Sequence, residues 1–236
     1  MLLTKEQLKT CTDVTGQEIV YRDGHYWMKR DAREYLLMPW RANKRLSNMR
    51  TCILDGSVRD ISVMKSECVV QRCFPLSSLA AKELDICEWV LDDRIAEVFA
   101  LTDETHVFHL IGRMKSGRRI TIDISNNLHE NVRETERHEV ISSNGSLVDL
   151  PVGMQLATED IYAFTADCEH PQVFSEVILG QEFYTREQAA IIRDVRSLLL
   201  NEKELETRES RMDELQRIVH AAFLSSKELK RKEIQA

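Results

Sequence analysis

THVFHLIGRMKSGRRITIDISNNLHENVRETERHEVISSNGSLVDL, residues 105–150, is the stretch that decides the fold. Two links within it contain turn dipeptides, Ser-Gly in residues 115–118 and Asn-Gly in residues 142–145. Gly and Asn tolerate the positive φ angles that tight hairpins need. We therefore predict consecutive antiparallel strands at His106–Met114, Arg119–Ser125, Arg137–Ile141 and Ser146–Leu150.

The second of these strands shows which face of the sheet is buried. Ile120, Ile122 and Ile124 alternate with polar residues, and alternate residues of a strand point to opposite faces. We expect one apolar face that needs a cover and one polar face, or one that pairs with a partner.

Further elements are predicted on both sides of this stretch. A capping box at 4–7 indicates a helix to about Thr12, and Ser47 is expected to cap another that ends near Gly56. Pro75 and the serines after it start a central helix. The strands are expected at Glu18–Arg30 (a hairpin around Asp23-Gly24), Glu34–Met38, Ile61–Phe74, Glu97–Leu101 and Asp160–Thr165.

Apolar stripes define the faces of the helices. The central helix carries Ala80, Leu84, Cys87 and Leu91 at helical spacing. A second capping box at 185–188 opens the helical final third, whose stripes are Ala189, Ile192, Val195 and Leu199, then Met212, Leu215, Val219 and Ala222. Glu204 to Arg208 and Asp213 to Arg217 have i,i+4 spacing, and we expect that face to be exposed.

Together these elements predict an α+β fold. It would be an open, mainly antiparallel sheet with helices on one face and the other face exposed for pairing. We expect a homodimer through this exposed face, because an antiparallel sheet covered on one side leaves the other in need of a partner.

Composition excludes several classes of protein. The net charge of −7 and the pI near 5.6 disfavour a general nucleic-acid or membrane binder, which needs excess Lys and Arg. The sequence begins without a signal-peptide pattern and contains no apolar run of about 20 residues, so we expect a cytoplasmic protein.

Cysteine and histidine spacing predicts no metal centre. The six cysteines, at 11, 52, 68, 73, 87 and 168, form no Cys-x-x-Cys pair and are interpreted as small buried apolar residues. His106 and His109 are three apart on a strand, so their imidazoles point to opposite faces.

Several short strings resemble a known family. Residues 43–46 (NKRL) and 54–61 (LDGSVRDI), 84–91 (LDICEWVL) with Glu97-Val98, 116–120 (SGRRI), 139–141 (EVI) with 144–147 (NGSL), and 219–226 (VHAAFLSS) occur in the family's order. They are similar to the C-terminal domain of the glucose-fructose oxidoreductase, inositol dehydrogenase and MocA family of nicotinamide-dependent oxidoreductases. The resemblance covers residues 34–236, which leaves residues 1–33 as an N-terminal helix and hairpin extension.

The chain departs from this family where the chemistry lies. The family's cofactor half opens with a Gly-x-Gly-x-x-Gly turn that holds the pyrophosphate, and residues 1–33 are too short to form such a half. The family's D-x-x-x-H acid–base pair corresponds to Ser78 and Lys82 here. We therefore expect no nicotinamide cofactor and a chain that is not an enzyme.

A polar ligand remains compatible with the sequence. The candidate contacts are Asn43, Arg45, Lys82 and Asp85, the last from the 84–91 string. Three of these have a plainer interpretation. Asn43 and Arg45 would only hold the first turn of a helix, and Lys82 would be a solvated lysine on a helix first turn. Lys82 would be a base only if burial lowered its pKa by several units.

Three functional hypotheses follow. The favoured one is a non-catalytic stand-alone domain that acts in dimerisation or in partner or ligand binding. The second is the substrate-binding subunit of a split NAD(P)-dependent sugar or polyol oxidoreductase, whose cofactor domain lies on another chain. The third is a small-molecule module that uses the former substrate cleft.

Overall fold

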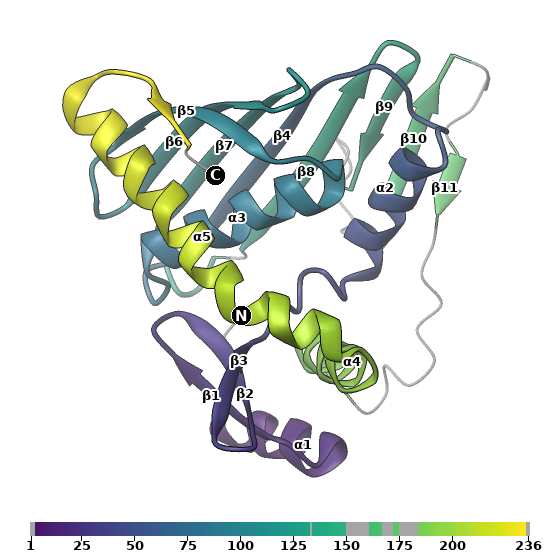
Figure 1. Cartoon of the computed structure of the whole chain (residues 1–236), viewed down its shortest axis with the longest axis vertical. Helices are drawn as coiled ribbons and strands as arrows, with labels where there is room; N and C mark the ends of the chain where they lie inside the picture. Colours follow the sequence, from purple (N-terminus) through teal and green to yellow (C-terminus); the bar gives the residue numbers. More distant parts are fainter. Residues whose placement is uncertain (1–2, 133, 150–160, 167–171, 175–183, 235–236) are drawn as a thin grey trace.

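The structure is a computed structural model that describes residues 3–132, 134–149, 161–166, 172–174 and 184–234 (Figure 1). Predictions that involve Leu150, Asp160 and Cys168 fall outside these ranges. None of the described helices has the length and apolar character that crossing a membrane requires.

The centre of the fold is a mixed sheet. Among the described residues it has nine strands in the order β11-β10-β9-β8-β4-β7-β6-β5-β12. Within it, β4 and β7 are parallel and the other described neighbours are antiparallel. The strands are β4 (Ile61–Gln71), β5 (Ile95–Thr102), β6 (Val107–Met114), β7 (Arg119–Leu128), β8 (Thr135–Ser142), β9 (Gly145–Val148), β10 (Ile161–Thr165), β11 (Gln172–Phe174) and β12 (Lys232–Glu233).

One predicted pairing is wrong. β7 and β8 follow one another along the chain but do not pair, because β4 lies between them and pairs with both. The link from Leu128 to Thr135 is longer than a two-residue hairpin and includes a turn closed by the Val132 N–H and the His129 carbonyl, so β7 and β8 need not be neighbours. The tight links at Gly117 and Gly145 form the predicted hairpins, β6–β7 and β8–β9.

The α+β class and the one-sided cover are as predicted. Helices α2 (Lys44–Leu54), α3 (Leu76–Leu91) and α5 (Glu202–Glu228) lie over one face of the sheet (Figure 1). Ile120, Ile122 and Ile124 of β7 are buried beneath them. On the opposite face, Val107 and Ile111 of β6 are about half exposed.

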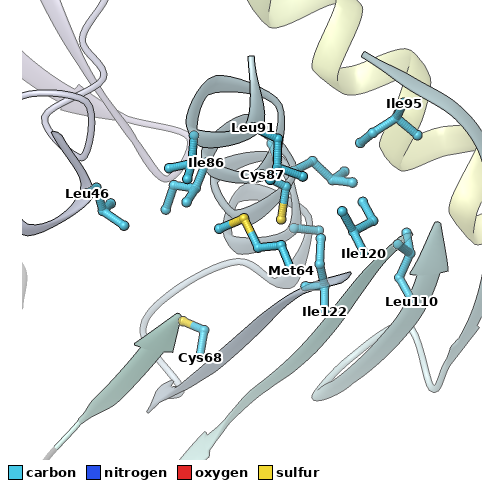
Figure 2. Packing of buried hydrophobic residues seen from close by; sticks show 14 of the residues in the cluster. Leu46, Met64, Cys68, Ile86, Cys87, Leu91, Ile95, Leu110, Ile120 and Ile122 are labelled. Atoms are coloured by element: carbon cyan, nitrogen blue, oxygen red, sulfur yellow. The ribbon is translucent and has the colours of Figure 1, made fainter. Parts of the chain in front are cut away.

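Helix α3 is the centre of the main core. Its predicted stripe is buried, but so are most of its other residues, because α2 and α5 pack on its outer sides. Figure 2 shows Cys87 and Leu91 above Met64 and Ile122 of the sheet. Each fully buried side chain of this size stabilises the fold by about 1.5–3 kcal/mol.

The N-terminal residues form a second, smaller unit. Helix α1 (Lys5–Thr15) precedes a three-stranded sheet of β1 (Glu18–Arg22), β2 (His25–Arg30) and β3 (Arg33–Leu36). This unit shares a hydrophobic cluster with α4 (Arg186–Leu200), built from Met28, Leu37, Ile191 and Val195 among others. Strand β3 contains both Arg33 and Glu34, on either side of the predicted boundary. The cluster joins the N-terminal unit to residues between Ile191 and Leu205.

Both predicted capping boxes are present. Thr4 with Gln7 caps α1, and Thr185 with Gln188 caps α4. The cap of α2 differs from the prediction. The helix begins four residues earlier than expected, because the Asn43 side chain accepts from the Arg45 N–H and takes the place expected for Ser47.

Two predicted exposures are wrong. Arg208 pairs with Glu204 as expected, yet its side chain is only 1% exposed. Its Nη2 also donates to Asp194 Oδ1 at 2.9 Å, because the break at Asn201 folds this face of α5 onto α4.

Among the cysteines, Cys11, Cys52, Cys68 and Cys87 are buried as expected, whereas Cys73 is exposed in the turn after β4.

Candidate functional site

A cavity of about 470 Å³ lies where the N-terminal unit meets the main domain. The β1–β2 hairpin covers it with Tyr21, Gly24 and His25, while α2, α3, β8 and α4 supply the other walls. Asn43, Arg45, Ser78 and Lys82, four of the positions singled out in the sequence, line this one cavity.

A chain of alternating charges forms the polar wall. Lys82 Nζ pairs with Glu136, and lies 3.4 Å from Glu83 Oε1. His138 links the two buried acids of the chain: its Nε2 is 3.1 Å from Glu83 Oε2, and its Nδ1 is 2.8 Å from Asp149 Oδ2. Arg45 Nη1 lies 3.9 Å from the same Asp149 oxygen. The members in order are Arg45, Asp149, His138, Glu83, Lys82 and Glu136.

Local structure explains this convergence. Lys82 and Glu83 are neighbours on α3, and Glu136 and His138 are two apart on β8, so their side chains share one face of that strand. Asp149 follows β9 and also accepts from the His138 backbone N–H at 2.7 Å. Ser66 of β4 donates to Glu83 Oε2 at 2.6 Å.

Electrostatics keep the buried members of the chain ionised. Burial alone would lower the pKa of His138, but the Asp149 and Glu83 carboxylates outweigh it and raise that pKa to about 10. Burial would raise the pKa of Glu83, and Lys82 and His138 instead lower it to about 2. Burial would also lower the pKa of Lys82, but Glu136 and Glu83 raise it above its ordinary value.

The expectation of a solvated Lys82 is therefore wrong. The residue lies in the second turn of α3, and its side chain is 19% exposed with two carboxylate partners. Its raised pKa is the opposite of what a general base at neutral pH requires.

Ser78, the other position matched to the family's acid–base pair, is covered by the hairpin. Its hydroxyl donates to the Asp23 carbonyl at 3.0 Å. Gly24 has φ +81°, and a Cβ at this position would overlap the Ser78 hydroxyl. The hairpin turn therefore sits directly on the start of α3.

The remaining candidates have clear places. Asn43 caps α2, as its plainer interpretation predicts, and it also lines the cavity. Asp85 lies apart from the cavity lining and is fully buried. Its carboxylate accepts from Arg41, Trp40 and Arg211 at 2.6–2.8 Å, and so connects α3 to α5. Burial would raise its pKa, but Arg41 and Arg211 lower it to about 2.

Within the described ranges, one group of side chains has metal-ligating atoms close together. Cys68, Glu83 and Glu136 place theirs within 4.8 Å of one another. The ammonium of Lys82 already pairs with both glutamates there. His106 and His109 bond to different partners, Asn126 and Asp123.

Sequence reasoning missed Glu83, Glu136, His138 and His25. A signal existed for two of them. Strand alternation puts His138 on the same face as the buried Val140, and Glu83 lies in a helix predicted to pack on the sheet. A buried polar residue is informative, because it needs a partner.

Comparison with known proteins shows which solved structures have a similar fold. No protein-family model matches the sequence, and no curated protein matches it significantly. Among solved structures, 84% of the chain superposes on an oxidoreductase domain protein from Kribbella flavida (TM-score 0.67, 14% identity, 66% of that chain). It is also similar to a levoglucosan dehydrogenase in complex with NADH and levoglucosan (TM-score 0.64, 12% identity, 84% of this chain and 65% of that chain).

A third structure is an inositol dehydrogenase homologue from Azotobacter vinelandii with NADH and myo-inositol (TM-score 0.63, 11% identity, 83% of this chain and 63% of that chain). These neighbours define the class: the chain has an oxidoreductase-type α+β fold. More specifically, its fold is consistent with the C-terminal domain of the glucose-fructose oxidoreductase, inositol dehydrogenase and MocA type, which the sequence strings resemble. The chain spans about two-thirds of the length of these neighbours.

Proposed function

We propose that this protein is a non-catalytic binding module that holds a small, uncharged, polyhydroxylated ligand in the cavity beneath the N-terminal hairpin. The observation that carries the proposal is the docking of the hairpin turn on Ser78, above a cavity whose wall contains Lys82 fixed between two carboxylates.

Loss of chemistry is the first part of the proposal. An alcohol oxidation needs a group that accepts the hydroxyl proton at neutral pH. Lys82 stays protonated, and both ring nitrogens of His138 are engaged by carboxylates. Ser78 uses its hydroxyl proton on the Asp23 carbonyl. The positions matched to the family's acid and base are thus occupied by structural contacts.

The charge of the wall supports an uncharged ligand. Three cations, Arg45, Lys82 and His138, alternate with the carboxylates of Asp149, Glu83 and Glu136. A charged ligand would lose its hydration on entering the cavity, and these six side chains would offer it no unpaired counter-charge.

The apolar part of the wall suits the C–H faces of a ring, because Tyr21, Tyr26 and Trp40 line the same space. Two neighbours of similar fold are described with levoglucosan and with myo-inositol, which are both uncharged cyclic polyols.

The subunit of a split oxidoreductase is the alternative. Its support is the shared fold alone. The N-terminal unit lies over the cavity through its contact with Ser78, so a separate cofactor domain would first have to displace the hairpin. This is why we rank the binding module first.

Thermal unfolding with matched sugars tests the proposal. The panel is D-glucose and myo-inositol (neutral), D-glucuronate (anionic), D-glucosamine (cationic), NAD and NADP. A neutral ligand at 100 times its dissociation constant should stabilise the fold by about 2.7 kcal/mol, which raises Tm by about 5–10 °C. We expect this rise with a neutral member and none with the charged sugars or the nicotinamides.

Two variants on one helix provide the control. Ala190→Phe should fill the cavity and abolish the rise, because Ala190 lines it. Ala189→Phe, one residue away on α4 and outside the lining, should retain it. A rise with NAD or NADP would favour the oxidoreductase alternative, and no rise with either neutral polyol would contradict the binding module.

A further inference from the structure

His25 is the first residue of β2 and follows the Asp23-Gly24 turn. It lines the cavity described above and also a second one, of about 600 Å³, whose floor includes Met212, Val219 and Phe223 of the outer helix α5. Ser78 is likewise shared by both cavities. The hairpin turn and the start of α3 therefore form a partition between them.

This partition holds the backbone at His25 in a fixed position. The hydrogen bond from Ser78 Oγ to the Asp23 carbonyl anchors the turn, and the Arg22–His25 pair closes the hairpin behind it. Gly24 leaves no room for a side chain between the turn and Ser78. A fixed backbone limits the region that the His25 side chain can reach, which lowers the cost of ordering it on a ligand.

His25 is a buried polar side chain without a partner. It is 9% exposed, and no hydrogen bond or ion pair reaches its ring within the described residues. Among the described residues, the polar side-chain atoms that are both sealed from solvent and unpaired are Tyr21 Oη, Glu83 Oε1, Arg137 Nε and Arg208 Nε. The unpaired ring nitrogens of His25 are not among them, so they keep contact with open space. His138, in contrast, has both nitrogens bonded.

The His25 ring is neutral at physiological pH, because burial lowers its pKa to about 4 although Asp23 acts to raise it. A neutral imidazole offers one N–H donor and one acceptor nitrogen. Lys82, Glu136 and His138 of the same wall, by comparison, are already engaged in the chain of alternating charges.

We infer that His25 is the residue that determines specificity in this cavity, and that it selects a ligand by hydrogen bonding to the ligand's hydroxyl groups. This rests on the proposed binding function. A hydroxyl both donates and accepts, so either imidazole nitrogen can engage one. A ligand that lacks the hydroxyl leaves the imidazole buried and unpaired, and sites of this kind reject such analogues strongly.

The test uses D-glucose and myo-inositol, each with its singly deoxygenated analogues, titrated by calorimetry. In the wild-type protein, removal of one particular hydroxyl should weaken binding by at least about tenfold. His25→Leu should bind the parent polyol at least about tenfold more weakly and lose this discrimination. His25→Gln, whose amide also donates and accepts, should retain both.

The matched control is His220→Leu, because His220 lines only the second cavity. It should leave the affinities unchanged. The ring nitrogens of His25 in wild-type protein, followed by ¹⁵N nuclear magnetic resonance, should shift on addition of the polyol, which provides a readout independent of any variant's stability.

The outcomes separate the two proposals. Failure of wild-type protein to bind either polyol would remove the proposed function and this inference with it. Binding by the wild type with equal affinity in His25→Leu, or with unchanged His25 nitrogen signals, would overturn the inference and leave the binding function intact.

Discussion

At the scale of single residues, the wall of the cavity depends on pairing of buried charges. Glu83 is fully buried and ionised, and Lys82 and His138 are the cations that hold it so. Removing one partner of a buried pair leaves an uncompensated charge, which costs far more than the pair itself contributes.

We therefore predict that Lys82→Ala destabilises the protein by about 3–5 kcal/mol in urea unfolding. The matched control is Lys65→Ala. Lys65 also faces a glutamate, Glu139, but its side chain is 51% exposed. Its loss should cost no more than about 1 kcal/mol. An ordinary surface substitution costs less than about 0.5 kcal/mol. So small a cost for Lys82→Ala would show that the buried chain of alternating charges is not formed in solution.

His138 makes the fold less stable as the pH rises from neutral to alkaline values. Its pKa is about 10 in the folded protein and about 6.5 in the unfolded chain. Between these values the folded state binds more protons than the unfolded state, so the free energy of unfolding decreases as pH rises. The contribution of His138 is complete below pH 6.5 and is lost as pH passes 10.

His138→Gln should therefore be less stable at pH 6 and show a flatter decrease in unfolding free energy from pH 6.5 to 10. Urea unfolding at several pH values measures both effects. The comparison is His220→Gln, at an exposed position on α5. Parallel pH curves for His138→Gln and the wild type would mean that the imidazole is not held as a cation.

The residues of the cavity were only partly predictable. Asn43, Arg45, Ser78 and Lys82 were found because resemblance to a family pointed to their positions. Their partners were not, because Glu136 and His138 lie more than 50 residues from Lys82 in the sequence. A sequence pattern identifies a buried polar residue but does not say which distant strand supplies its counter-charge.

At the scale of elements, the features decided within a few residues were predicted well. The capping boxes at Thr4 and Thr185 and the turn at Asp23-Gly24 all form. The position of β4 between β7 and β8 was not predicted, because strand order depends on pairing between strands that are far apart in the sequence. Hairpin turns fix only the pairs that they connect.

Helix α3 shows a second limit of pattern reading. Its apolar stripe predicted one buried face, yet α2 and α5 cover it on other sides as well. Asp85 and Glu88 are consequently buried, and they are tolerated because Arg211 pairs with both. Charged residues in a sequence thus indicate exposure only when no partner of opposite charge is brought to them.

At the scale of the whole molecule, helices α2, α3 and α5 lie on one face of the nine described strands (Figure 1). Within the described residues, the opposite face carries no helical layer. On β5 and β6 this face carries Leu101, Val107 and Ile111, each 45–49% exposed. Phe99 lies opposite Ile111 on the neighbouring strand, and the four apolar side chains surround His109, which lies opposite Leu101 and pairs with Asp123; this face of β5 and β6 forms the patch.

We predict that two copies of the chain pair through this patch. Polar residues of β7, such as Thr121 and Asp123, adjoin it and would form a hydrated rim. Light scattering should give a dimer at micromolar concentration. Ile111→Asp should shift it to monomer, because burying a large aliphatic side chain contributes about 1.5–3 kcal/mol, and a carboxylate at the same place is desolvated without a partner.

The matched control is Leu200→Asp. Leu200 is 89% exposed at the end of α4, away from the sheet, so an aspartate there changes the net charge equally without touching the patch. This variant should remain dimeric. A wild-type protein that is monomeric at micromolar concentration contradicts the prediction directly. A dimer that survives Ile111→Asp but not Leu200→Asp would move the interface from the sheet to the α4–α5 side, where the exposed leucine would then be its centre.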